Sequence, residues 1–123
     1  MSKRNVVHVE IPASDVPSAA KFYETLFGWK MEHAAEFDYT MWDDGAGYGG
    51  GFNKVSAENP AGQVLVYIHS DDIEADLRKV EELGGAVVTP KTEIPGTGWF
   101  AWFKDPTGNR LALYTSKNPE FNK

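Results

Sequence analysis

The chain contains no cysteine, no long apolar run and no strongly basic stretch. The absence of cysteine excludes disulfides, thiolate zinc sites and cysteine nucleophiles. No apolar run approaches the roughly 18 residues that a membrane-spanning helix needs. Residues 1–5 do not have the pattern of a signal peptide. We therefore expect a cytoplasmic protein that has no membrane partner.

The charge balance excludes a further class of partner. The net charge is −6, and the lysines and arginines are scattered among acidic residues. Binding to a phosphate backbone would lack its main driving force, so no nucleic-acid partner is expected. Aromatic residues are plentiful at 13% of the chain. Their rings must lie in a core, an interface or the wall of a binding site.

An internal repeat organises the 123 residues. A shift of 57 positions, without gaps, brings related residues of the two halves together. The matched pairs are Asp15 with Asp72, Val16 with Ile73, Lys21 with Arg78, Glu24 with Glu81, Leu26 with Leu83, and Gly28 with Gly85. Each copy reads as a strand, an acidic helix start, an amphipathic helix and a helix-ending glycine.

The pattern predicts an α+β fold of two tandem βαβββ modules in a single domain, 1–123. Module 1 is expected at about 5–55, a linker at about 56–62 and module 2 at about 63–115. The predicted strands are 6–11, 30–34, 38–42 and 48–54 in the first module, and 64–69, 86–89, 99–104 and 110–115 in the second. On the first helix, apolar residues share one face, and they are Val16, Ala19, Ala20, Tyr23, Leu26 and Phe27.

Three segments carry a resemblance to a known family. They are HVEIPASDVPSAAKFYETLFGWK from His8, DDIEADLRKVEELGGAVV from Asp71, and FKDPTGNRLALY from Phe103. In this order and spacing they resemble the vicinal oxygen chelate superfamily of glyoxalases, bleomycin-resistance proteins and extradiol dioxygenases. The resemblance implies a curved mixed-sheet half-barrel with a concave cleft, and it implies a homodimer.

Metal-using members of that superfamily place a His or Gln on the first strand of each module and a Glu on the last. In this chain His8 matches the first ligand position, but the repeat carries it onto Leu65. The last strand has Ala112 where a Glu is expected, and the strand 48–54 contains glycines and no carboxylate. One position in four is filled, so we expect no metal or other cofactor. A displaced divalent site using Glu10, His33 or His69 is the alternative.

Side chains alternate along strands, so candidate cleft residues follow from the position of His8. Glu10 would face the cleft beside His8. The strand 99–104 contributes either Trp99, Ala101 and Phe103 or Phe100 and Trp102. The candidate ligand-binding residues are His8, Glu10, Leu65, Tyr67, His69, Trp102, Arg110, Ala112 and Tyr114. His8 and Glu10 are the catalytic candidates.

The glycine-rich segment 45–51 could be mistaken for a phosphate-binding loop. It lacks the following helix and the Lys-Ser/Thr pair that such a loop requires. A hairpin, or a strand where two backbones approach closely, is the expected structure.

Three functions remain in view. The leading one is metal-independent binding of a small aromatic or hydrophobic molecule in the cleft. The second is a lyase or isomerase of the glyoxalase type that uses His8 or Glu10 as an acid or base, or a displaced metal. The third is a dimeric subunit that binds a protein partner.

Overall fold

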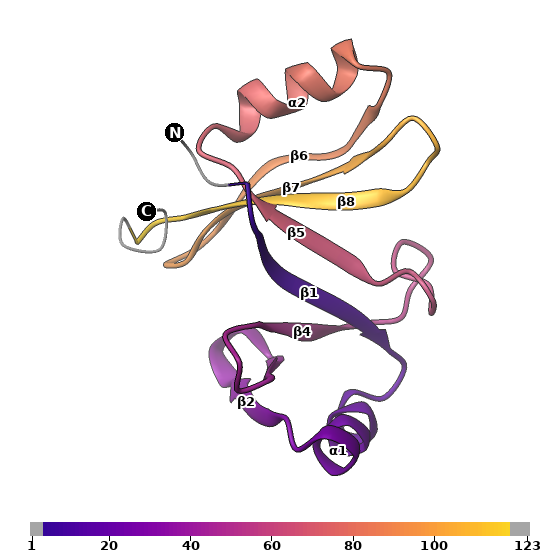
Figure 1. The fold of residues 1–123 in the computed structure, drawn as a ribbon, viewed down its shortest axis with the longest axis vertical. Helices are drawn as coiled ribbons and strands as arrows, with labels where there is room; N and C mark the ends of the chain where they lie inside the picture. The colour runs from indigo at the N-terminus through magenta and orange to yellow at the C-terminus, as the bar shows by residue number, and fades with distance from the viewer. Residues whose placement is uncertain (1–3, 119–123) are drawn as a thin grey trace. The chain divides into compact units, whose positions relative to one another are not determined.

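The computed structural model describes residues 4–118, which fold as two copies of one βαβββ arrangement (Figure 1). The first copy consists of β1 (Val6–Ala13), α1 (Val16–Phe27), β2 (Lys30–Ala34), a short 3-10 helix (Ala35–Phe37), β3 (Tyr39–Asp43) and β4 (Gly49–Lys54). The second consists of β5 (Leu65–His69), α2 (Ile73–Glu82), β6 (Ala86–Ile94), β7 (Gly98–Lys104) and β8 (Arg110–Ser116). The predicted α+β class with two tandem βαβββ modules is confirmed.

The chain divides into two compact units. One is Val7–Leu65, and the other combines residues 66–118 with residues 4–6. These bounds lie near the predicted modules. Residues 1–3 and 119–123 of the predicted 1–123 domain lie outside the described residues. Neither helix in the described part is long and apolar enough to cross a membrane.

The first module is a four-stranded mixed sheet in the order β2-β3-β4-β1. β1 runs parallel to β4, and the other neighbours are antiparallel. Val9 pairs with Gly50, and Glu10 pairs with Gly51. Because paired residues share a face of a sheet and neighbours alternate, the two pairs lie on opposite faces. The core against α1 consists of Ala13, Trp42 and Phe52 with Val9, Ile11, Val16, Ala19, Ala20, Tyr23, Trp29 and Met31.

The ends of α1 follow the sequence signals. The helix begins after Asp15 and has a proline in its first turn. It ends at Gly28, whose φ of +74° is a conformation that favours glycine. The Asp15 side chain makes no hydrogen bond to a backbone N–H of the helix. It accepts a hydrogen bond from the Ser18 hydroxyl at 2.5 Å instead.

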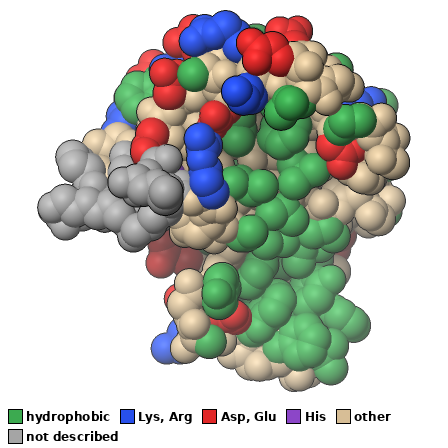
Figure 2. All heavy atoms as spheres, turned by 45° about the horizontal axis from the view of Figure 1, so that its top comes forward, with side chains coloured by type: hydrophobic (Ala, Val, Ile, Leu, Met, Phe, Trp, Pro, Cys, Tyr) green, Lys and Arg blue, Asp and Glu red, His purple; other side chains and the backbone are tan. Residues whose placement is uncertain are grey.

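The last turn of α1 differs from the rest of its apolar face. Leu26 and Phe27 are 58% and 57% exposed, although they share a helical face with half-buried neighbours. Trp29, which follows the helix, stacks on Trp42 at 4.2 Å and on Tyr23 at 5.4 Å. Apolar side chains therefore gather on the surface of this module, where they contribute to the green area in Figure 2.

The second module is a four-stranded sheet in the order β5-β8-β7-β6, with β5 parallel to β8. Its core against α2 is formed by Ile73, Leu77, Ala101 and Leu113, with Val87, Trp99 and Phe103 packed on them. Since residues 99, 101 and 103 face the helix, Phe100 and Trp102 face the other side of the sheet. This settles which set of β7 side chains is free of the helix.

β6 is longer than the sequence predicted. It runs to Ile94, although the sequence predicts a strand that stops at Thr89, before Pro90. β6 is the edge strand of its sheet, where a missing backbone N–H is tolerated. Its register against β7 shifts on both sides of Thr89, as expected of an irregular edge.

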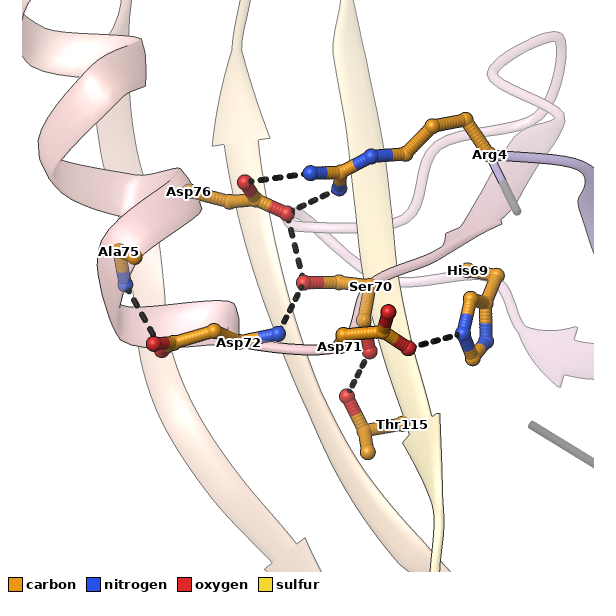
Figure 3. A network of polar contacts seen from close by, with 8 residues as sticks. All are labelled: Arg4, His69, Ser70, Asp71, Asp72, Ala75, Asp76 and Thr115. Carbon is orange, nitrogen blue, oxygen red and sulfur yellow. Dashed lines mark hydrogen bonds and ion pairs between the residues drawn. The ribbon is translucent and has the colours of Figure 1, made fainter. Parts of the chain in front are cut away.

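A polar network ties the N-terminal residues to the start of α2 (Figure 3). Arg4 donates two hydrogen bonds to Asp76, at 2.5 and 3.2 Å, and the Ser70 hydroxyl donates to Asp76 at 2.6 Å. Burial would raise the pKa of Asp76, but the hydrogen bonds from Arg4 and Ser70 outweigh it and lower that pKa. The Asp72 side chain accepts from the backbone N–H of Ala75 at 3.1 Å and caps the helix. The network thus connects the segment before β1 and the segment after β5 to the first turn of α2.

Candidate functional site

Three polar side chains form a hydrogen-bonded chain on the helix-free face of the first module. His8 Nε2 lies 2.7 Å from the hydroxyl oxygen of Tyr39. That hydroxyl donates to Glu10 Oε2 at 2.7 Å. His8 and Glu10 lie two residues apart on β1, whereas Tyr39 is the first residue of β3. The predicted neighbours His8 and Glu10 are thus joined through a third residue.

Tyr39 was not among the residues that the sequence indicated. It reaches β1 across β4, which lies between β3 and β1 in the sheet. An ideal Cβ built on Gly51 would lie 1.9 Å from the Tyr39 hydroxyl oxygen, so the phenol occupies the space of an absent side chain. The signal in the sequence was the glycine run itself. It indicated a close approach but not its partner.

The protonation state of His8 determines the direction in which protons are donated along the His8–Tyr39–Glu10 hydrogen bonds. Burial lowers the pKa of His8 to about 4, so the imidazole is neutral at pH 7. A neutral imidazole carries one N–H and one lone pair. Because the phenol donates its own proton to Glu10, the tautomer with the proton on Nε2 suits the contact with Tyr39. The order of donation is then imidazole to phenol to carboxylate, an arrangement that can hold or transfer a proton at Glu10.

The helix-free face of the second module is aromatic. Tyr67 on β5 pairs with Ala112 on β8, which pairs with Trp102 on β7. The Trp102 indole N–H lies 3.4 Å from the Tyr67 hydroxyl, and the Arg110 guanidinium lies 4.7 Å from the centre of the indole ring. Trp102 therefore lies between a phenol and a cation, as in many binding surfaces for aromatic groups.

The other predicted residues of this face have different surroundings. Leu65 and Ala112 are fully buried and offer no polar atom. His69 is 1% exposed, and its Nε2 lies 2.8 Å from Asp71 Oδ1 (Figure 3). Tyr114 pairs with His69, and its hydroxyl lies 3.4 Å from the carbonyl oxygen of Thr97. Of the predicted residues in this module, the structure thus groups the half-buried Trp102 and Arg110 with the buried Tyr67 around one indole ring.

A divalent metal does not fit the residues present. Among residues 4–118, no group of three or more His, Cys, Asp or Glu side chains is arranged to hold a metal ion. In the first module, the position beside Glu10 on β4 is Gly51, which has no donor. In the second, Leu65 and Ala112 are apolar. His8 and Glu10 are thus two donors at most, and the atoms they would offer, Nε2 and Oε2, already contact the Tyr39 phenol.

Comparison with known proteins identifies the family. The model of the Glyoxalase/Bleomycin resistance protein/Dioxygenase superfamily matches residues 5–113. A glyoxylase-like domain-containing protein of Didymella fabae is 34% identical over 116 residues, covering 87% of this chain and 90% of that protein. The putative glyoxylase CFP32 of Mycobacterium tuberculosis is 28% identical over 123 residues, and the match spans 86% of this chain but only 43% of that protein.

Solved structures share the fold at low identity. Methylmalonyl-CoA epimerase from Mycobacterium tuberculosis superposes with a TM-score of 0.66 at 14% identity, covering 96% of this chain and 91% of that one. A superfamily member from Vibrio splendidus 12B01 has a TM-score of 0.66 at 13% identity, covering 90% and 97%. These structures support the fold, and the family model matches most of the sequence. The chain belongs to the Glyoxalase/Bleomycin resistance protein/Dioxygenase superfamily.

Proposed function

We propose that the chain binds a small aromatic or hydrophobic molecule without a resident metal ion. The observation that carries the proposal is the indole of Trp102 on the helix-free face of the second module, between Tyr67 and Arg110. Aromatic faces attract planar ligands through stacking and through burial of apolar area. Small-molecule sites are usually lined by apolar and aromatic side chains with a small number of polar groups.

The first module, taken by itself, also carries groups suited to a small-molecule ligand. His8, Tyr39 and Glu10 are half-buried, and each is fixed by its neighbour. Fixed polar groups orient a ligand at a lower entropic cost than mobile ones. Residues 4–118 contain no group of three metal-ligating side chains, and this favours a ligand held by rings or hydrogen bonds over one chelated through its oxygens.

The test is calorimetric titration with a panel of aromatic acids, amines and neutral aromatics, before and after treatment with EDTA. Trp102→Leu should weaken binding of any hit by at least about tenfold. Trp99→Leu is the matched control, because Trp99 lies on the same strand but packs toward α2. Circular dichroism checks that both variants are folded. A hit whose affinity is insensitive to Trp102→Leu, or that is lost with EDTA, would contradict the proposal.

A second function, a lyase or isomerase, has its own observation. The Glu10 carboxylate accepts a hydrogen bond from Tyr39, and an acceptor of this kind can serve as a general base. Such a base would remove a proton from carbon next to a carbonyl and return it to the product. Incubation of candidate carbonyl compounds in D₂O, followed by NMR, would detect the exchange. Glu10→Gln should abolish exchange if Glu10 is the base, and unchanged exchange would exclude this role.

We also propose that the protein is a homodimer, as the family resemblance implies. Several large apolar side chains are exposed, among them Phe22, Leu26 and Phe27 on α1. Sedimentation equilibrium should give a mass near twice the 13.6 kDa of the chain. A species of 13.6 kDa across the concentration range would contradict the dimer. A dimer without any ligand in the panel would favour the third function, a subunit that binds a protein partner.

A further inference from the structure

Tyr39 reaches its partners in an unusual way. Its Cα lies on β3, whereas His8 and Glu10 lie on β1, and β4 separates these strands. Neighbouring strands are about 4.8 Å apart, so the side chains of Tyr39 and of its partners on β1 together span about 10 Å across the face of β4. The side chain must therefore lie directly over a residue of β4.

The residue beneath the phenol is Gly51. It pairs with Glu10 on one side and with Met41 on the other. A Cβ at position 51 would lie 1.9 Å from the Tyr39 hydroxyl oxygen, 2.1 Å from Cζ and 2.7 Å from Cε2. These three nearest atoms all belong to the Tyr39 side chain. Since no positive φ requires glycine at position 51, the reason for glycine here is the ring above it.

Gly50 differs from Gly51, although the two are adjacent. A Cβ on Gly50 would lie 1.8 Å from the backbone carbonyl oxygen of Val9. Gly50 therefore allows two backbones to approach, which is a requirement of the sheet itself. Gly51 makes room for one side chain. Glycine at position 50 is therefore required by the packing of the sheet, whereas glycine at position 51 is required by the Tyr39 side chain.

We infer that Gly51 is a positioning residue, whose missing side chain seats the Tyr39 phenol between His8 and Glu10, and that this seat gives the site a phenol in place of a metal ion. The phenol contacts Nε2 of His8, which is one of the two atoms through which histidine binds metals. A carboxylate at position 51 would lie beside Glu10, but it would collide with the ring. Phenol and metal site are therefore mutually exclusive at this position.

The inference deepens the second proposed function, because it assigns Gly51 and Tyr39 to the polar group of the first module that holds Glu10. Its tests need no ligand, however. A failure to find an aromatic ligand would leave the results below unaffected, and the reverse also holds.

A double-mutant cycle between positions 39 and 51 tests the seat. Gly51→Ala should lower the urea midpoint in the wild-type background and leave it nearly unchanged in the Tyr39→Ala background, because the obstructing ring is then absent. Gly50→Ala is the matched control, and it should be equally disruptive in both backgrounds. An equal effect of Gly51→Ala in both backgrounds would overturn the inference.

The imidazole supplies a readout that a purely structural role would leave unchanged. In wild-type protein, the ¹⁵N signal of His8 Nε2 at pH 7 should show a protonated, hydrogen-bonded nitrogen. In Gly51→Ala it should move toward the signals of His33, whose side chain is half-exposed. An unchanged His8 signal in Gly51→Ala would mean that the phenol does not depend on the glycine.

The metal part is tested with Ni(II) alone, by calorimetry. Wild-type protein and Gly51→Glu should show no binding that depends on His8. The double variant Tyr39→Ala/Gly51→Glu brings three donors together, and it should bind Ni(II) at least about tenfold more tightly than wild type. Adding His8→Ala should remove the gain. Binding to wild type through His8, or no gain in a folded double variant, would overturn the inference.

Discussion

At the scale of single residues, His8 makes stability depend on pH. Burial lowers its pKa to about 4, whereas an exposed histidine titrates near 6.5. Between these values the unfolded chain binds a proton that the folded chain does not. The free energy of unfolding should therefore be highest above pH 6.5 and fall as the pH is lowered toward 4, by at most about 3 kcal/mol.

The measurement is urea denaturation at several pH values between 4 and 7. His8→Asn should reduce the slope of stability against pH in this window, whatever its effect at pH 7. The same substitution at His33 controls for the loss of a histidine as such. A slope that survives His8→Asn would assign the pH dependence to other groups.

Tyr39 is the second residue with a measurable energetic role. Tyr39→Phe removes one hydroxyl that contacts both His8 and Glu10. Loss of a partner by half-buried polar groups should lower the free energy of unfolding by about 1–3 kcal/mol. Tyr48→Phe is the control, because Tyr48 is 65% exposed, and it should cost close to nothing. Equal costs for the two variants would show that the hydrogen-bonded chain adds no stability.

These residues also show how far sequence reasoning reaches at this scale. Alternation along β1 was enough to place His8 and Glu10 on one face, because it is a local property of a strand. Tyr39 could not be found in this way. Its contact depends on the order of β3, β4 and β1 across the sheet, and strand order is set by long-range packing. A glycine run signals a close approach, but it does not name the group that approaches.

At the scale of elements, the two helices begin with matched aspartates that behave differently. The Asp72 side chain accepts a hydrogen bond from the N–H of Ala75, whereas Asp15 caps no backbone N–H of its helix. Asp72→Ala should therefore lower the free energy of unfolding by about 1 kcal/mol. Asp15→Ala should cost less than half of that. Both variants lose a negative charge near a helix N-terminus, but only Asp72→Ala also loses a hydrogen bond to a backbone N–H of the helix. Equal losses in thermal or urea unfolding would mean that the hydrogen bond to Ala75 contributes little.

Elements were predictable wherever their signals are local. The strand 30–34 and the end of α1 at Gly28 agree with the sequence pattern. The prediction that β6 stops before Pro90 was wrong. A proline is compatible with a strand only at a sheet edge, and a single sequence does not show which strand lies at an edge. Prediction failed again at the end of α1, where helical periodicity predicts a buried Leu26 but the side chain is 58% exposed.

At the scale of the whole molecule, the internal repeat was the basis for predicting the fold. A shift of 57 residues identified two modules, and both fold as βαβββ. A repeat constrains many residues at once, so errors at single positions do not alter the result. Function is less constrained, because the same fold accommodates different sites. Belonging to the superfamily therefore leaves the ligand to be argued from Trp102 and from the His8–Tyr39–Glu10 chain.

The connection between the modules gives a last prediction. Residues 55–64 join β4 to β5, and Gln63 and Val64 are both exposed. Insertion of ten Gly/Ser residues between Gln63 and Val64 doubles this connection, and it should cost only about 0.6 kcal/mol of stability, the entropy of a longer loop. The same insertion between Gly108 and Asn109 should cost clearly more, because Asp105 accepts three backbone N–H groups in that turn. The measurement is the urea midpoint of each insertion variant, compared with that of the wild-type protein. A larger loss for the insertion after Gln63 would show that the connection contributes to the fold beyond joining the two units.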